Sequence, residues 1–186
     1  AGSGMAKILE SLGVDVVVSG GQTMNPSTKD LLDAVERVNA DAVIILPNNS
    51  NIIMAAQSAA GLSEVPCAVV PTKSVPQAFS ALFSADETAS LEENVENMTS
   101  AFADTKTGEV TTAIKDSKDA HDNPIHNGDV IGIADGSIEA VGSSVEDVVM
   151  SLLDTMEAED ADTLTLLAGE DFSDEQLDAL VERIES

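Results

Sequence analysis

The stretch that decides the fold is residues 42–54, which read AVIILPNNSNIIM. Residues 42–46 are a continuous apolar run that includes three β-branched side chains, and such a run predicts a buried strand. A proline and four polar residues then break the run. Apolar residues return at Ile52, Ile53 and Ala56 with the spacing of one helix face. A strand, a polar loop and a helix in this order are typical of a parallel sheet that helices cover on both faces.

The same unit occurs on either side of this stretch. Residues 14–18 (VDVVV) predict an earlier strand, and residues 67–70 (CAVV) predict a later one. Val16, Val43 and Val69 hold corresponding positions, 43 − 16 = 27 and then 69 − 43 = 26 residues apart. Three such strands with helices between them predict parallel pairing through crossover connections.

Serine residues mark the starts of the predicted helices. Ser27 and Asp30 form a predicted capping box, and Ser74 precedes a helix with a proline in its first turn. Gly61 is expected to end the helix that begins near Ile52. In the helix after Ser74, the side chains expected to face the core are Phe79, Leu82 and Phe83.

The pattern changes after residue 105. Residues 110–114 alternate like a half-exposed strand, and residues 130–133 and 138–141 flank Asp135-Gly136, which predicts a two-residue hairpin. Residues 163–168 predict a further strand. Ser144 and Ser173 are expected to cap two more helices, and a long acidic helix is predicted from Leu91.

The predicted fold class is therefore α/β, with a mostly parallel sheet, helices on both faces and a β-hairpin insertion. Residues 1–186 are expected to form a single domain. Strands are also expected before the helix at 5–12 and after Ser186, so the chain is interpreted as a piece of a longer protein that lacks terminal strands.

The chain carries 34 acidic and 8 basic residues, a formal charge of −26. Nucleic-acid binding is excluded because too few lysine and arginine residues are present to replace phosphate counterions. The charge has two open interpretations: solubility, or attraction of a basic partner. No apolar run reaches about 18 residues, so no membrane span is predicted. The single cysteine, Cys67, is interpreted as a small buried side chain, and its isolation is compatible with a reducing, cytoplasmic location.

Three polar loops follow the three predicted parallel strands, and each leads into a helix. Ligands gather at the carboxyl ends of parallel strands, where free N–H groups of helix termini favour anions. The same residue types also serve turns and caps, so a purely structural role remains open. The residues expected to contact a ligand or partner are Gly20, Gly21, Gln22, Thr23, Asn25, Ser27, Asn48, Asn49, Asn51, Thr72 and Lys73.

No complete catalytic set is found in the sequence, and no catalytic or metal-binding residues are assigned. His121 and His126 lie near Asp119 and Asp122, but their spacing matches no common metal site. Gly20-Gly21 lacks the third glycine of a dinucleotide-binding fingerprint, and no phosphate-binding loop with the GxxxxGK[ST] pattern is present. No cofactor is expected in this chain.

Four segments together resemble a known family. They are residues 20–28 (GGQTMNPST), 46–56 (LPNNSNIIMAA), 70–77 (VPTKSVPQ) and 128–133 (GDVIGI). The combination resembles the C-terminal domain of the dihydroxyacetone-kinase-like, DAK phosphatase-like proteins, the large subunit of bacterial fatty acid kinase. The resemblance covers essentially the whole chain and implies an EDD-type fold, shared with DegV-like fatty-acid-binding proteins.

The resemblance implies a non-catalytic docking domain of an ATP-dependent kinase. A DegV-like fatty-acid-binding subunit would dock here, and its fatty acid would be phosphorylated to an acyl phosphate for phospholipid synthesis. ATP and Mg²⁺ are expected in an N-terminal domain of the parent protein, which is expected to be a homodimer. Family members usually continue into a final strand and a second Gly-Gly-Gln segment, whereas this sequence ends at Ser186.

Two other functions remain open. Some relatives of the fold bind dihydroxyacetone or a similar small polyol through a histidine, but His121 and His126 lie far in sequence from the three polar loops. A phosphatase is the other alternative, and the chain contains no recognisable cysteine or aspartate nucleophile motif for it.

Overall fold

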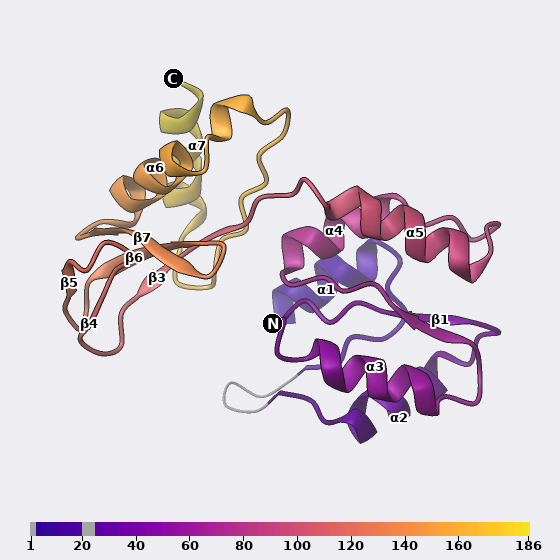
Figure 1. The fold of residues 1–186 in the computed structure, drawn as a ribbon. Coiled ribbons are helices and arrows are strands. Elements are labelled where there is room, and N and C mark those ends of the chain that lie inside the picture. Colours follow the sequence, from indigo (N-terminus) through magenta and orange to yellow (C-terminus); the bar gives the residue numbers. More distant parts are fainter. Residues whose placement is uncertain (1–2, 20–24) are drawn as a thin grey trace. The chain divides into compact units, whose positions relative to one another are not determined.

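The computed structural model describes residues 3–19 and 25–186 of the chain (Figure 1). The chain divides into two compact units, Ala1–Thr105 and Lys106–Ser186, which are described separately below. The α/β class is confirmed. The expectation of one domain over residues 1–186 stays a prediction.

The first unit contains a short parallel sheet. Its elements are α1 (Ser3–Ser11), α2 (Thr28–Val38), β1 (Val43–Ile45), α3 (Ile53–Leu62), β2 (Cys67–Val69), α4 (Val75–Phe83) and α5 (Leu91–Phe102). β1 and β2 pair in parallel, with Val43 opposite Cys67 and Ile45 opposite Val69. The prediction of parallel strands at these two places is therefore confirmed.

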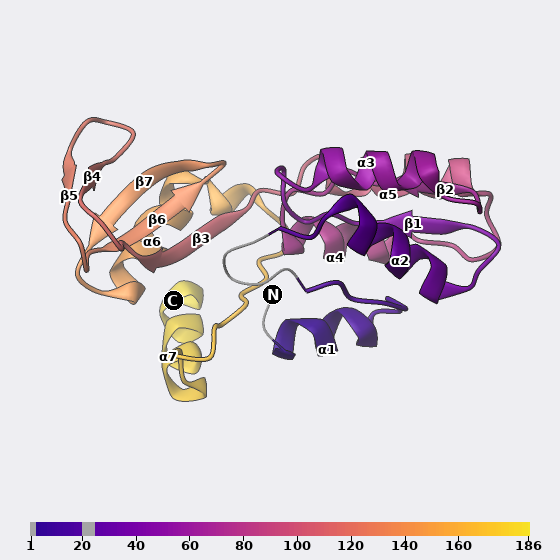
Figure 2. The same ribbon diagram turned by 90° about the horizontal axis from the view of Figure 1, so that it is seen from below.

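Helices cover both faces of this sheet, as the alternation of side chains along β1 requires. Ile45 packs against a buried cluster built on Leu31 and Ala56, from α2 and α3. Its neighbour Ile44 packs on the opposite side, against a cluster that contains Met98 of α5. Figure 1 shows α4 and α5 on one side of β1 and α2 and α3 on the other, and in Figure 2, which views the layers from below, α3 overlaps α5.

The predicted strand at residues 14–18 is wrong, because the structure assigns no strand to this segment. A strand requires a ladder of hydrogen bonds to a neighbour, and in the described part of the chain β1 pairs only with β2. Val18 nevertheless packs against the cluster of α2 and α3. The apolar side chains of residues 14–18 therefore indicate packing against the core and not pairing with a neighbouring strand.

Two details of the predicted helices are also wrong. Gly61 does not end α3, which continues to Leu62 and is followed by Ser63 in an extended conformation. Phe83 does not face the core, since 77% of its surface is exposed. It lies in the last turn of α4, beyond the buried residues Ala78, Phe79 and Ala81 of that helix.

The second unit is built on antiparallel strands. Its elements are β3 (Gly108–Thr112), β4 (Ser117–Lys118), β5 (Pro124–Ile125), β6 (Val130–Ala134), β7 (Ser137–Gly142), α6 (Val145–Thr155), the 3₁₀ turn η1 (Ala158–Asp160) and α7 (Asp174–Glu185). β3, β6 and β7 form one sheet in that order, and β4 pairs with β5. The predicted strand at residues 163–168 is wrong: the segment has no strand assignment, because no described strand pairs with it.

The predicted hairpin is confirmed. β6 and β7 are antiparallel and are joined by Asp135 and Gly136, whose φ angles are 50° and 82°. Positive φ at both central residues is the mark of a type I′ turn, whose twist matches that of the strands it connects.

Within the described ranges, no helix is both long and apolar enough to cross a bilayer.

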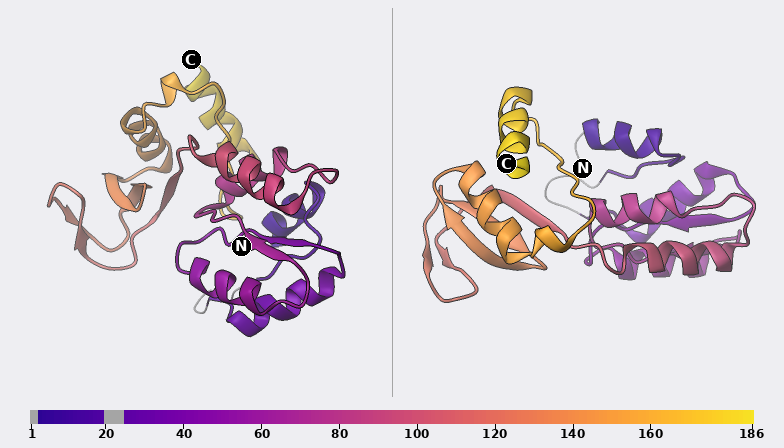
Figure 3. Two further views of the ribbon diagram at one scale, coloured as in Figure 1. Left: turned by 45° about the vertical axis from the view of Figure 1, so that its right-hand side comes forward. Right: turned by 90° about the horizontal axis from the view of Figure 1, so that it is seen from above.

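Helix α6 packs against the three-stranded sheet (Figure 3), and glycines of the sheet lie at the contact. A Cβ atom added to Gly132 would lie 3.0 Å from Val148 Cγ1 and 3.2 Å from the Cβ of Ala140. Both neighbours are stiff, since Val148 is β-branched and Ala140 has no rotatable side chain. The approach of α6 therefore depends on the absence of a side chain at position 132.

We expect Gly132→Val to lower the free energy of unfolding by about 1–3 kcal/mol, because overpacking forces side chains and backbone to shift. This corresponds to a fall of roughly 2–10 °C in Tm, measured by circular dichroism. Gly169→Val is the matched control, since nothing lies within 4 Å of a Cβ there. Equal Tm values for the two variants would contradict the close approach of α6.

An ion pair connects α7 to the start of α6. Arg183 Nη1 lies 2.9 Å from Asp147 Oδ1 and 3.8 Å from Glu146 Oε2. The hydrogen bond from Arg183 lowers the pKa of the Asp147 carboxyl, and a contact with Ser144, the N-cap of α6, lowers this pKa further. A lowered pKa means that the contact stabilises the fold above the ordinary carboxyl pKa and is lost as the pH falls through the lowered value.

We expect Arg183→Gln to raise the pKa of Asp147 toward its ordinary value, because the principal donor is removed. The measurement is an NMR titration of the Asp147 carboxyl carbon. Lys115→Gln is the control, since the described part of the structure gives Lys115 no ion pair. The Tm difference between wild type and Arg183→Gln is expected to shrink as the pH falls below the ordinary carboxyl pKa of about 4, and to vanish once the pH is below the lowered pKa of Asp147 in the wild type. An unchanged Asp147 pKa in Arg183→Gln would rule out the pairing.

Candidate functional site

Two of the three predicted loops lie side by side at the carboxyl ends of the parallel strands. Residues 47–51 follow β1 and lead into α3, and residues 71–74 follow β2 and lead into α4. The parallel pairing continues to the edge of this region, where Val70 N donates to Ile45 O at 3.1 Å. The register of β1 against β2 therefore sets the two loops next to each other.

A pair of hydrogen bonds joins the two loops. Asn48 N donates to Thr72 Oγ1 at 3.0 Å, and Thr72 Oγ1 donates to Asn48 Oδ1 at 2.7 Å. Thr72 is completely buried, and Asn48 adopts a left-handed conformation with φ of 60°. Asparagine tolerates this conformation better than most residues. The Thr72 hydroxyl is thus engaged on both sides and holds the loops in place.

The accessible polar groups lie around this contact. Asn51 is exposed, and its N–H donates to Asn49 Oδ1 at 2.9 Å. Lys73 is exposed and is the one ammonium group on the two loops. No side chain caps the N-terminus of α3, where the N-cap position is Ile52. Backbone N–H groups, side-chain amides and one cation suit hydrogen bonding to a carboxylate, a phosphate or a main-chain carbonyl.

The first predicted loop is described only in part. Gly20, Gly21, Gln22 and Thr23 lie outside the described residues. Asn25 is exposed, and Ser27 serves as the N-cap of α2. Ser27 Oγ accepts from Asp30 N at 3.1 Å, and Asp30 Oδ2 accepts from Ser27 N at 2.9 Å, which confirms the predicted capping box. A ligand-binding role for these six residues stays a prediction.

Gln77 is a positioning residue that the sequence analysis did not single out. Its Oε1 accepts a hydrogen bond from Lys73 N at 2.7 Å, and its N–H donates to Ser74 Oγ at 3.3 Å. Gln77 thereby fixes the backbone from which the Lys73 side chain projects. The available signal was its place three residues after the N-cap serine, where glutamine often completes a capping arrangement.

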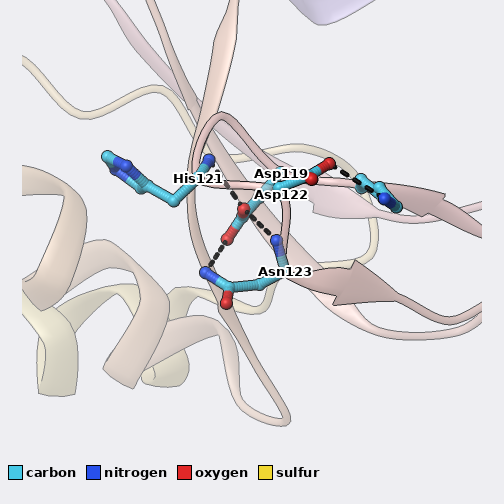
Figure 4. A network of polar contacts seen from close by, with 5 residues as sticks. Asp119, His121, Asp122 and Asn123 are labelled. Carbon is cyan, nitrogen blue, oxygen red and sulfur yellow. Dashed lines mark hydrogen bonds and ion pairs between the residues drawn. The ribbon is translucent and has the colours of Figure 1, made fainter.

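The segment around the two histidines belongs to the second unit, whereas the loops belong to the first. Asp119 Oδ1 accepts from the backbone N–H groups of His121 and Asn123 at 2.8 and 2.9 Å, and its Oδ2 accepts from Asn123 Nδ2 at 3.1 Å (Figure 4). These bonds lower the pKa of Asp119, chiefly the one from the Asn123 side chain. The aspartate therefore folds the turn between β4 and β5.

The remaining chemistry-bearing side chains in the described part of the chain do not form a metal centre. No group of three or more histidine, cysteine, aspartate or glutamate side chains there is placed to bind a metal ion. His121 Nε2 instead lies 3.3 Å from Glu139 Oε2, and His126 N donates to Asp129 Oδ2. Cys67 is half-buried, and burial raises the pKa of its thiol, which keeps it protonated.

Comparison with known proteins assigns the family. Residues 1–186 match the FakA-like C-terminal family, whose members resemble the C-terminal part of a fatty acid kinase subunit. Over 96% of its own length, the present chain is 45% identical to protein YloV of Bacillus subtilis. Over 100% of its own length, it is 40% identical to a protein of Staphylococcus haemolyticus. A protein of Staphylococcus aureus strain USA300 is 39% identical over 99% of the chain. The chain spans about a third of the length of these relatives, 32–33% in each case. This chain therefore belongs to the FakA-like C-terminal family of fatty acid kinase subunits.

Proposed function

We propose that this chain is the docking domain of a fatty acid kinase. It binds a DegV-like fatty-acid-binding protein and presents the carboxylate of the bound fatty acid to an ATP and Mg²⁺ site in another domain of the parent protein. The product of the assembly is an acyl phosphate. The family membership over residues 1–186 is the observation that carries this proposal.

The chemistry of the two joined loops supports a binding role. Their polar side chains include the amides of half-buried Asn49 and exposed Asn51 and the ammonium of exposed Lys73. Such groups recognise main-chain carbonyls and carboxylates on a partner surface without performing acid–base chemistry. We place the contact with the partner on these loops.

The structure of the loops also limits what each residue contributes. Thr72 is buried and bonded to Asn48, so its part is to position the loops rather than to touch the partner. Asn49 and Lys73 are the side chains that contact the partner in this proposal.

The charge of the chain supports association with a basic surface. The net charge is −26, with only 8 basic residues. Complementary charge raises the rate of association and is screened by salt, with a Debye length of about 10 Å at 0.1 M. Binding driven by this charge weakens as the salt concentration rises.

The test is isothermal titration of the chain with a lipid-loaded fatty-acid-binding protein from the same genome, at 50 mM and 500 mM salt. We expect saturable one-to-one binding that is weaker at the higher salt concentration. Absence of heat at both salt concentrations, with the partner shown to be folded and loaded, would refute the docking role.

In the same titration, Asn49→Ala is expected to weaken binding about tenfold, because removal of a hydrogen bond to a partner costs about 1 kcal/mol. Little change in Tm is expected, because the side chain is only half-buried and the hydrogen bond that it accepts from Asn51 N is exposed. Asn127→Ala is the control, with the same substitution on an exposed residue of the second unit. A large fall in Tm for Asn49→Ala would instead identify the loop as purely structural.

Thr72→Val is expected to act through stability. It leaves Asn48 N and Asn48 Oδ1 without their partner, which costs about 1–3 kcal/mol of unfolding free energy. Thr72→Ser, which keeps the hydroxyl, is expected to recover most of the loss in thermal unfolding. Thr88→Val is the control, because it removes a hydroxyl bonded at 2.7 Å to Asp86 at an exposed site. An equal loss of unfolding free energy in Thr72→Val and Thr88→Val would show that the buried bond between the loops stabilises the fold no more than an exposed hydroxyl bond does.

A further inference from the structure

In the part of the chain that the structure describes, strand β2 has an open edge. Among the described residues, β1 is its only neighbour in the sheet. Val43 N donates to Pro66 O at 3.0 Å and Val70 N donates to Ile45 O at 3.1 Å. Because peptide groups alternate in direction along a strand, the N–H and C=O groups of Cys67 and Val69 face away from β1. The structure shows no hydrogen bond to those outward groups within the described part of the chain.

An apolar groove lies beside this strand. It measures about 500 Å³ and runs between β2 and α5. Ala68 of β2 and Leu91 and Val95 of α5 supply its apolar surface, and Glu92 and Glu96 of α5 stand on it as carboxylates. No lysine or arginine of the described chain lines the groove.

The two carboxylates have the spacing of side chains on an added strand. Glu92 and Glu96 are four residues apart on a helix, about 6 Å along its axis. Alternate residues of a strand repeat every 6.6 Å or so. Figures 1 and 2 show α5 running along the direction of β1, so an added strand beside β2 would lie along α5 as well.

We propose that the outer edge of β2 and this groove form a docking surface for an extended peptide segment of a partner protein, which adds to the sheet as a third strand. The segment carries lysine or arginine at alternate positions. Its main chain pairs with Cys67 and Val69, the methylenes of its basic side chains cover Ala68 and Val95, and the cationic ends reach Glu92 and Glu96. Lysine and arginine side chains are suited to cover apolar surface in this way.

Charge decides between a basic partner and a second copy of this chain. A second copy paired edge to edge would bring its own glutamates to the same groove, and like charges close together disfavour the contact. A basic segment neutralises them. The residues that line the groove lie on β2 and α5, and none of them belongs to the loops at residues 47–51 and 71–74, so the proposal does not depend on the proposed docking of a fatty-acid-binding protein.

The probe is a labelled heptapeptide, acetyl-Thr-Lys-Val-Lys-Val-Lys-Val-amide, titrated with the whole chain and followed by fluorescence anisotropy at 150 mM salt. We expect saturable binding by this peptide. A peptide of the same composition with its lysines three residues apart, acetyl-Lys-Val-Val-Lys-Thr-Val-Lys-amide, is expected to bind at least tenfold more weakly, because no two of its lysines are two residues apart on one face of the strand. Equal binding of the two peptides would show nonspecific attraction to an acidic protein and overturn the proposal.

N-methylation tests the strand pairing without altering the protein. The N–H groups of the lysines lie on one edge of the extended peptide and those of the valines on the other. Methylation of the backbone nitrogens of all three lysines blocks one edge of the peptide, and methylation of the backbone nitrogens of all three valines blocks the other. The two methylated peptides carry the same charge. We expect one pattern to abolish binding and the other to retain it. Retention or loss with both patterns would overturn the proposal.

Variants of the chain locate the surface. Cys67→Pro removes an outward N–H at the first residue of an edge strand, a position where proline is tolerated, and is expected to abolish binding, whereas Cys67→Val retains it. Glu92→Gln with Glu96→Gln is expected to weaken binding about tenfold, through the loss of two ion pairs. The matched control, Glu10→Gln with Glu36→Gln, changes the net charge equally at exposed sites outside the groove. Equal weakening by the two double variants would place the peptide elsewhere.

Light scattering on the chain alone completes the test. We expect a monomer, and a dimer that Cys67→Pro dissociates would show that a second copy occupies the edge, which overturns the proposal.

Discussion

The first unit depends on the parallel pairing of two strands of three residues each. Parallel strands cannot be joined by a tight turn, so β1 and β2 require the intervening helix α3 to cross over and return. Their register then sets where each following loop begins. Because Ile45 faces Val69, the chain leaves the sheet at adjacent points, and Asn48 comes within hydrogen-bonding distance of Thr72. The register of β1 against β2 therefore determines where the connecting helix and the two loops lie.

In the second unit, the core depends on glycines at the contact between a helix and an antiparallel sheet. Its antiparallel strands place glycines beneath α6, and the helix approaches until Val148 and Leu152 reach the backbone. The whole chain has no tryptophan or tyrosine and only four phenylalanines. Close approach of backbones compensates for the small volume of aliphatic side chains, because packing density decides how much dispersion energy a core gains.

Local signals predicted most of the elements and much less of the pairing. Serine caps, the Asp135-Gly136 turn and the β-branched run at 43–45 each act within a few residues, and all are found where expected. Residues 14–18 and 163–168 have similar composition but no described strand beside them, and strand pairing is a nonlocal property. The placement of the loops at 47–51 and 71–74 followed from the order of strands and helices. The bond between Asn48 and Thr72, the support from Gln77 and the groove beside α5 depend on register and side-chain direction, which periodicity alone does not supply.

The type I′ turn has a consequence for the order of folding. It joins β6 and β7 through two residues, so the chain loses little entropy in closing that loop. β1 and β2 must instead close a connection that includes the whole of α3 before their first contact forms. Contacts between residues near in sequence form fastest. We therefore expect the hairpin to form early in the second unit and the parallel pairing of the first unit to form more slowly, so that the two units fold on different timescales.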